Sequence, residues 1–152
     1  MKHSILLFIM LSATILAARP NSRTADEGAV MKITKADFLK NIMDYEKNPK
    51  VWKYAGTLPC VVDFYADWCG PCRLASPVLE ELAKKYKGQI VVYKVNTDQE
   101  KELAGVFQIS GIPAFLWVPK NGNPTMKSGV PSDPTAIKEQ FEKMINEVLL
   151  KK

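Results

Sequence analysis

The chain has 152 residues, 47% hydrophobic and 24% charged, so it is long enough for one well-filled core and too short for two. Its net charge is +5, but the basic residues are interleaved with acidic ones and form no basic block with interleaved aromatic side chains. The composition therefore argues against a nucleic-acid-binding protein and favours a solvated, lysine-rich surface.

The amino-terminal end is unlike the rest of the chain. A short basic start, Met1 to His3, precedes an uncharged apolar run from Ile5 to Ala18, and a polar stretch begins at Arg19. This layout is typical of a secretory signal, and the apolar run is shorter than the roughly 20 residues that a membrane-spanning helix needs. We therefore predict export to the periplasm or another extracytoplasmic compartment, with retention as an uncleaved membrane anchor as the alternative.

Three parts are expected along the chain. We predict a signal peptide over residues 1–18, a flexible lead-in over residues 19–29, and a single domain over residues 30–152. No internal repeat or second linker interrupts the sequence of that domain.

Hydrophobic spacing and turn residues predict the elements of the domain. Thr34 is expected to cap a helix, and Asn121-Gly122 to form a tight hairpin turn. In chain order the predicted elements are a strand at residues 30–33, a helix at 35–47, a strand at 60–66, a helix at 71–87, a strand at 90–95, a helix at 100–107, strands at 114–118 and 125–127, and a helix from 134. The connection rules predict an α/β fold, with helices on both faces of a parallel arrangement that ends in an antiparallel hairpin.

Cys69 and Cys72 are separated by two residues where a predicted strand meets a predicted helix. A zinc site needs about four ligands, but the only histidine is His3, inside the predicted signal peptide. The same lack of histidine argues against Cys–His nucleophilic catalysis, and Arg73 stands where covalent haem attachment requires histidine. A purely structural disulfide is the remaining alternative, but so small a loop gains little from closure. The pair is therefore best interpreted as a redox dithiol.

The position of the two cysteines suggests a division of roles. Cys69 is expected at the helix N-terminus, where free amide N–H groups and the helix dipole favour a thiolate, so it should be the attacking sulfur. Pro71 fits the first turn, where its missing N–H costs nothing. Cys72, one turn inside, is expected to be more buried and to resolve the mixed disulfide.

Two charged residues stand inside apolar strand segments. Asp63 is the only charged residue of its strand, and a buried carboxyl resists ionisation, so it is a candidate proton carrier near neutral pH. Lys94 is the lone cation of the next buried strand and is the expected partner of Asp63. The alternatives are a carboxylate that reaches water at a strand end and a lysine that extends to the surface.

Residues 30–150 resemble the thioredoxin family, in particular exported bacterial members. The segment from Val62 to Cys72, VDFYADWCGPC, is similar to the family's active-site signature almost letter for letter. Further similarity lies in KVNTD at residues 94–98, in ISGIP at residues 109–113, and in Asn121-Gly122 before Gly129. The resemblance implies a thioredoxin fold, in which a central mixed sheet is flanked by helices on both faces.

The resemblance also implies the roles of individual residues. Cys69 and Cys72 would form the redox-active disulfide, without a cofactor or metal, and Asp63 with Lys94 would assist proton transfer at Cys72. Pro113 would be a cis-proline facing the dithiol. The implied substrate-binding residues are Trp68, Gly70, Pro71, Ile112, Pro113, Gly129 and Val130.

The predicted function is an extracytoplasmic protein-disulfide reductase, because Gly-Pro between the cysteines is associated with reductants in this family. Its expected partners are exported client proteins with disulfides and a membrane electron donor, with no nucleic acid, and the protein is expected to be a monomer. The alternatives are an oxidase or isomerase that forms disulfides, and a non-catalytic binding module. Cys60 is interpreted as a small core residue, with a regulatory or intermolecular thiol as the alternative.

Overall fold

The computed structural model describes residues 28–151. The predicted signal peptide and most of the predicted lead-in therefore lie outside the described residues. Between residues 28 and 151, no helix combines the length and the apolar content needed to cross a membrane. In chain order the elements are β1 (Val30–Lys32), α1 (Lys35–Asn41), β2 (Cys60–Tyr65), α2 (Gly70–Lys85), β3 (Val91–Asn96), α3 (Lys101–Val106), β4 (Ala114–Val118), β5 (Thr125–Ser128), α4 (Pro134–Met144) and a π-helical last turn, η1 (Ile145–Leu149).

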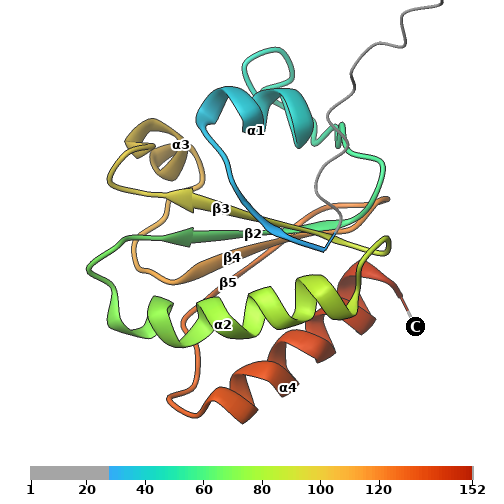
Figure 1. Cartoon of the computed structure of the whole chain (residues 1–152). Helices are drawn as coiled ribbons and strands as arrows, with labels where there is room; N and C mark the ends of the chain where they lie inside the picture. Colours follow the sequence, from blue (N-terminus) through green and yellow to red (C-terminus); the bar gives the residue numbers. More distant parts are fainter. Residues whose placement is uncertain (1–27, 152) are drawn as a thin grey trace, which may run out of the picture.

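The five strands form one mixed sheet in the order β1-β3-β2-β4-β5. β1, β3 and β2 are parallel, whereas β4 runs antiparallel to β2 and β5 antiparallel to β4. α2 and α4 cover one face of the sheet, and α1 and α3 cover the other (Figure 1). The predicted α/β class, the helices on both faces and the terminal antiparallel hairpin are confirmed.

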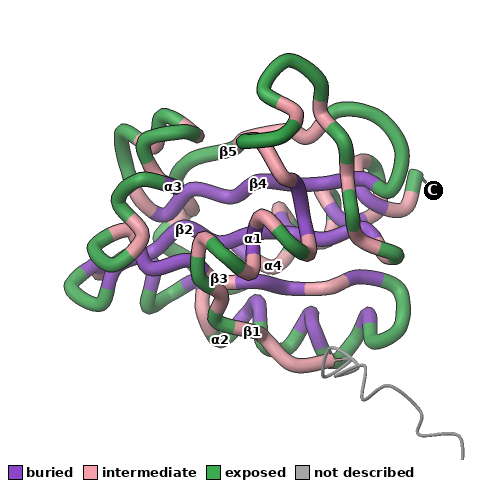
Figure 2. The backbone as a smooth tube through the Cα atoms, turned by 90° about the horizontal axis from the view of Figure 1, so that it is seen from above, coloured by how far each residue is buried: buried purple, intermediate pink, exposed green. Residues whose placement is uncertain are grey.

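β2 lies at the centre of the sheet and every one of its residues is buried (Figure 2). Its side chains alternate, so that Val61 joins the apolar cluster under α2 and α4 while Val62 and Phe64 join the cluster under α1 and α3. Burial on both faces explains why this strand reads as an almost continuous apolar run. The same strand carries Asp63 into the interior and leads directly to the cysteine pair.

The predicted helix starts are confirmed by their side-chain caps. The Thr34 hydroxyl accepts a hydrogen bond from the N–H of Asp37, whose carboxylate accepts one from the Thr34 N–H at 3.0 Å. Asp133 caps α4 by accepting from the N–H of Ala136 at 2.9 Å. Each cap satisfies donors that have no partner within the helix.

The predicted first helix is too long. α1 ends at Asn41, and the carbonyl of Ile42 accepts a hydrogen bond at 2.8 Å from the N–H of Ala55, far along the chain. Asp44 then closes a separate turn by accepting from the N–H of Lys47 at 3.0 Å. This long-range partner for Ile42 replaces the next helical hydrogen bond, although the apolar spacing continues.

The predicted tight turn at Asn121-Gly122 is also wrong. β4 ends at Val118 and β5 begins at Thr125, so residues 119–124 form a longer connection in which Gly122 has a φ of 99°. Pro119 and Pro124 stand at its two ends, and proline has no N–H to donate to the β-ladder. The paired strands therefore stop several residues before the turn that the sequence suggested.

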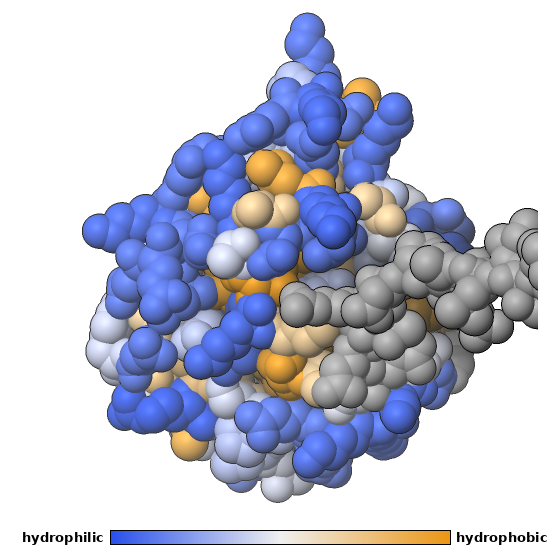
Figure 3. Space-filling model, turned by 45° about the horizontal axis from the view of Figure 1, so that its top comes forward, coloured by the Kyte–Doolittle hydropathy of each residue, from blue (hydrophilic) through white to orange (hydrophobic). Residues whose placement is uncertain are grey.

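The outer surface is mostly hydrophilic on the face that carries α1. Figure 3 shows hydrophilic side chains over most of the visible described surface, with apolar areas that are small and separate. Among the described residues the exposed large apolar side chains are few, and they are Val51, Trp68, Leu74 and Val106. Trp68 is the most exposed of them, at 68%, and it directly precedes Cys69.

Candidate active site

The cysteine pair lies between the end of β2 and the start of α2. Cys69 and Cys72 form a disulfide with an S–S distance of 2.11 Å. Cys69 is the N-cap residue of α2, and its Sγ accepts a hydrogen bond from the N–H of Cys72 at 3.2 Å. A sulfur that caps a helix lies where free N–H groups and the helix dipole favour negative charge. The predicted position of Cys69 is therefore confirmed.

Burial does not distinguish the two cysteines. Cys69 is 3% exposed and Cys72 is 2% exposed, so the expectation that Cys72 is clearly more buried is wrong. Both belong to a small apolar cluster with Tyr65 and Ala66, and Ile112 packs against it. The difference between the two sulfurs lies in the capping position that Cys69 occupies, not in access to solvent.

Asp63 and Lys94 lie opposite each other on β2 and β3. The Lys94 Nζ is 3.7 Å from the Asp63 Oδ2, which confirms the expected pairing. Asp63 is fully buried, and neither of its carboxylate oxygens has a hydrogen-bond partner. Burial raises the pKa of Asp63 to about 7, and the Lys94 ammonium opposes this rise only in part. The carboxyl can therefore exchange a proton near neutral pH.

The predicted substrate-binding residues lie at three places in the fold: the loop before β4, the segment after β5, and the start of α2. Pro113 is preceded by a cis peptide bond, as expected from the resemblance, and its carbonyl accepts a hydrogen bond from the N–H of Gly129 at 2.8 Å. Ile112 packs against the cysteine cluster, whereas Val130 packs against the apolar cluster under α2 and α4. Trp68 is exposed, and Gly70 and Pro71 form the first turn of α2 beside it.

A polar network links Trp68 to the end of β3, and the sequence did not assign it a role. The indole Nε1 of Trp68 donates to Asp98 at 2.9 Å, and the N–H of Asp98 donates to the side chain of Asn96 at 2.9 Å. Asn96 also donates to the carboxylate of Asp67 at 3.2 Å. β2 and β3 are parallel neighbours, so polar residues just after each strand meet at one edge of the sheet. That rule could have indicated the network.

We expect Asp98→Ala to free the Trp68 ring and to raise KM for a protein disulfide substrate several-fold, with little change in kcat. One hydrogen bond at an exposed site contributes about 1 kcal/mol, which corresponds to roughly five-fold in binding. Steady-state reduction of insulin measures both constants. Asp98→Asn is the matched control, because its side-chain oxygen can still accept from the indole. A KM unchanged in both variants would show that the network does not position Trp68.

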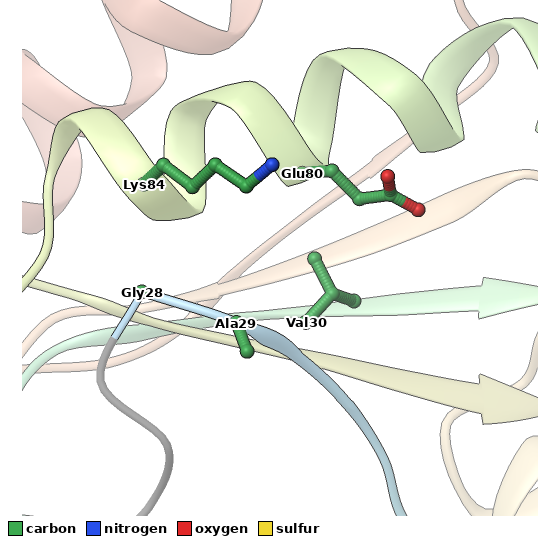
Figure 4. Close-up of a pocket in the computed structure, with 5 residues that line it drawn as sticks. All are labelled: Gly28, Ala29, Val30, Glu80 and Lys84. Carbon is green, nitrogen blue, oxygen red and sulfur yellow. The ribbon is translucent and has the colours of Figure 1, made fainter.

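Two other features take no part in this chemistry. A pocket of about 240 Å³ opens between the start of β1 and α2, where Val30 points toward Glu80 and Lys84 (Figure 4). Its lining contains no thiol, so it cannot exchange disulfides. Cys60 is fully buried on the opposite face of β2 from Asp63, and burial raises the pKa of its thiol to about 12. Its interpretation as a core residue is confirmed.

The described part of the chain contains no candidate metal site. Between residues 28 and 151, no group of three or more histidine, cysteine, aspartate or glutamate side chains could hold a metal ion. The residues that come together are instead a disulfide, a buried carboxyl and an ammonium group. This arrangement can accept and release electrons and protons with no added group.

Comparison with known proteins gives consistent results. The family model described as thioredoxin matches residues 29–146. A thioredoxin of Borreliella burgdorferi is 40% identical over 99 residues, which are 65% of this chain and 84% of that protein. A chloroplastic M-type thioredoxin of Spinacia oleracea is 39% identical over 118 residues, 76% of this chain and 62% of that protein. Among solved structures, chloroplastic thioredoxin z shares the fold, with a TM-score of 0.57 and 24% identity over 76% of this chain and 94% of its own.

Proposed function

Because the chain belongs to the thioredoxin family, we propose that it reduces disulfides of exported proteins outside the cytoplasm. Members of the family are disulfide oxidoreductases that act on protein substrates and carry their redox pair in the chain itself, without a cofactor. One observation carries the proposal: the sulfur of a disulfide caps α2, and the preceding strand β2 carries the buried Asp63, whose pKa burial raises to about 7.

The reaction begins from the reduced dithiol. The Cys69 thiolate attacks one sulfur of a client disulfide, so that a Cys69–client disulfide forms and the other client sulfur leaves as a thiolate, which takes a proton. Cys72 then loses its proton and attacks the Cys69 sulfur. The product is the Cys69–Cys72 disulfide found in the structure, and the second client sulfur leaves as a thiolate. Two electrons pass from the dithiol to the client.

Asp63 serves in this scheme as the acceptor of the Cys72 proton. A general base works best when its pKa lies near the working pH, and the pKa of Asp63 is about 7. A surface aspartate with a pKa near 4 would hold a proton too weakly for this purpose. The Lys94 ammonium, whose Nζ lies 3.7 Å away, stabilises the carboxylate before it accepts the proton and again after the proton has left.

The client chain is expected to bind beside Cys69. Trp68 offers a large exposed apolar surface directly before Cys69, and Ile112, which precedes the cis-proline Pro113, packs against the cysteine cluster. In the proposed complex the backbone at Ile112 pairs with the client chain, while Trp68, Gly129 and Val130 supply apolar contact. Gly70 and Pro71, which form the first turn of α2 after Cys69, are the other residues expected to contact the client.

Location and direction of electron flow rest on sequence features. The predicted signal peptide over residues 1–18 supports export, and Gly-Pro between the cysteines supports reduction. A reductase in an oxidising compartment needs a supply of electrons, so we propose a membrane protein as its donor. The second candidate is an oxidase or isomerase, which export into an oxidising compartment would favour.

Trapping the redox state in cells tests both parts of the proposal. Cells are fractionated, their thiols are fixed by acid and alkylated, and the masses of the protein in each fraction report how many cysteines are reduced. We expect the protein outside the cytoplasm, with Cys69 and Cys72 mostly reduced. A pool that is mostly oxidised there would favour the oxidase, and a cytoplasmic pool of full-length chain would contradict export.

A further inference from the structure

The Lys94 ammonium contacts two groups besides Asp63, and one of them, the Ser76 hydroxyl, is closer than the carboxylate. Its Nζ donates a hydrogen bond to the hydroxyl of Ser76 and lies 4.4 Å from the centroid of the Tyr65 ring. The distance from the same Nζ to the Asp63 Oδ2 is 3.7 Å, which is too long for a hydrogen bond. The ammonium is therefore held beside the carboxylate without touching it.

Ser76 lies on the part of α2 that faces this cluster. It is four residues after Cys72, so the two side chains share one face of the helix. The Ser76 hydroxyl therefore links α2, the helix that carries Cys72, to Lys94 on β3. Pro77 follows directly and has no N–H to donate to the carbonyl of Arg73, while the Ser76 hydroxyl accepts from Lys94 on the sheet.

Few charged groups surround Asp63. Lys94 on β3 and Lys32 on β1 continue the same row across the sheet, and Lys32 is 6.0 Å from the Tyr65 ring centroid. On the other side, β4 places the uncharged Phe115 opposite Asp63. From the covering helix, Cys72, Ser76 and Glu80 follow one another at four-residue spacing, and Glu80 borders the pocket beside Val30 at the start of β1. Lys94 is the residue that forms an ion pair with Asp63.

We propose that Ser76 is a positioning residue of the redox site, whose hydroxyl, together with the Tyr65 ring, keeps the Lys94 ammonium short of direct contact with Asp63. This inference rests on the proposed role of Asp63 as proton acceptor. An ammonium in direct contact would favour the charged carboxylate strongly, and Asp63 would then bind a proton too weakly at neutral pH. Holding the ammonium slightly apart keeps the carboxyl able both to take and to release a proton.

The test is the titration of the Asp63 side chain, followed by carbon NMR in the oxidised full-length protein. In Ser76→Ala the ammonium loses its hydrogen bond and can close on the carboxylate, so we expect Asp63 to titrate about one pH unit lower than in the wild type. The acid limb of the disulfide exchange rate should move in the same direction. Alanine is the best helix former, so the variant is expected to fold.

Two further variants make the result specific. Ser76→Thr keeps a hydroxyl and should restore the wild-type titration, whereas Lys94→Met removes the attraction and should move the titration upward. An unchanged titration in Ser76→Ala, or an upward shift like that of Lys94→Met, would overturn the proposal. Failure of threonine to restore the wild-type value would do the same. The titration itself uses no substrate, so its result is independent of whether the protein reduces or forms disulfides in the cell.

Discussion

Replacing Cys69 by serine should abolish the reduction of protein disulfides, lowering the rate by about 10³-fold or more. Cys69 is the residue whose sulfur caps α2 and forms the disulfide with Cys72. A serine hydroxyl can cap the helix equally well, so the fold should survive, but it cannot form a disulfide with a client. Insulin reduction with dithiothreitol as the electron source measures the loss.

Two companion variants separate chemistry from structure. Cys60→Ala removes the buried free cysteine on the opposite face of β2 and should leave the rate close to that of the wild type. Cys72→Ser keeps the attacking sulfur but cannot resolve the intermediate, so it should accumulate a covalent complex with the client that is visible on a non-reducing gel. Equal activity in Cys69→Ser and wild type would contradict the enzymatic account and favour a binding module.

Asp63→Asn should stabilise the folded protein at pH 8 by about 4 kcal/mol and leave its stability almost unchanged at pH 4. Burial raises the pKa of Asp63 from 3.8 to about 7. Each pKa unit corresponds to about 1.4 kcal/mol, so the shift, which already includes the attraction to Lys94, costs the folded state about 4 kcal/mol. A buried amide avoids that cost at every pH.

The direction of the pH dependence follows from the raised pKa. Below about pH 4 the carboxyl is protonated in both the folded and the unfolded state, and it imposes no penalty. As the pH rises from about 4 to about 7, the unfolded state loses this proton first, so the wild type loses stability. Above about pH 7 the penalty is constant. The gain from Asp63→Asn should therefore grow over that interval and then level off.

Urea unfolding of the oxidised protein at pH 4 and pH 8 measures this difference. Glu139→Gln is a suitable control, since Glu139 is exposed on α4 and its loss should change stability by less than about 0.5 kcal/mol at either pH. The same stability difference at both pH values would show that Asp63 does not titrate near neutral pH. Disulfide exchange by Asp63→Asn should also be slower near neutral pH, and an unchanged rate would remove Asp63 from the mechanism.

The sequence predicted best those features that depend on local pattern. Asp63 and Lys94 were recognisable because each is a single charge inside an apolar strand, and parallel pairing of β2 with β3 places them side by side. The role of Cys69 was recognisable because a strand-to-helix junction followed by Pro71 fixes the start of α2. In both cases a few neighbouring residues determine the geometry.

Features that depend on distant partners were missed. α1 stops at Asn41 because Ala55 takes the carbonyl of Ile42, and nothing near Ile42 in sequence indicates this. The residues around Ser76 give no sign of its role, because its partner Lys94 lies on β3, 18 residues later in the chain. The similar exposure of the two cysteines likewise depends on Ile112, which reaches them from the loop before β4. Tertiary contacts decided all three.

The redox potential of the Cys69–Cys72 pair tests the central proposal most directly. The purified protein is equilibrated with mixtures of reduced and oxidised glutathione, and the fraction of oxidised protein is measured after acid quenching and alkylation. We expect a potential at or below about −250 mV, in the range of reducing members of this fold, so that traces of oxidised glutathione already oxidise the pair. A potential above about −180 mV, in the range of isomerases and oxidants, would contradict a role as a reductase.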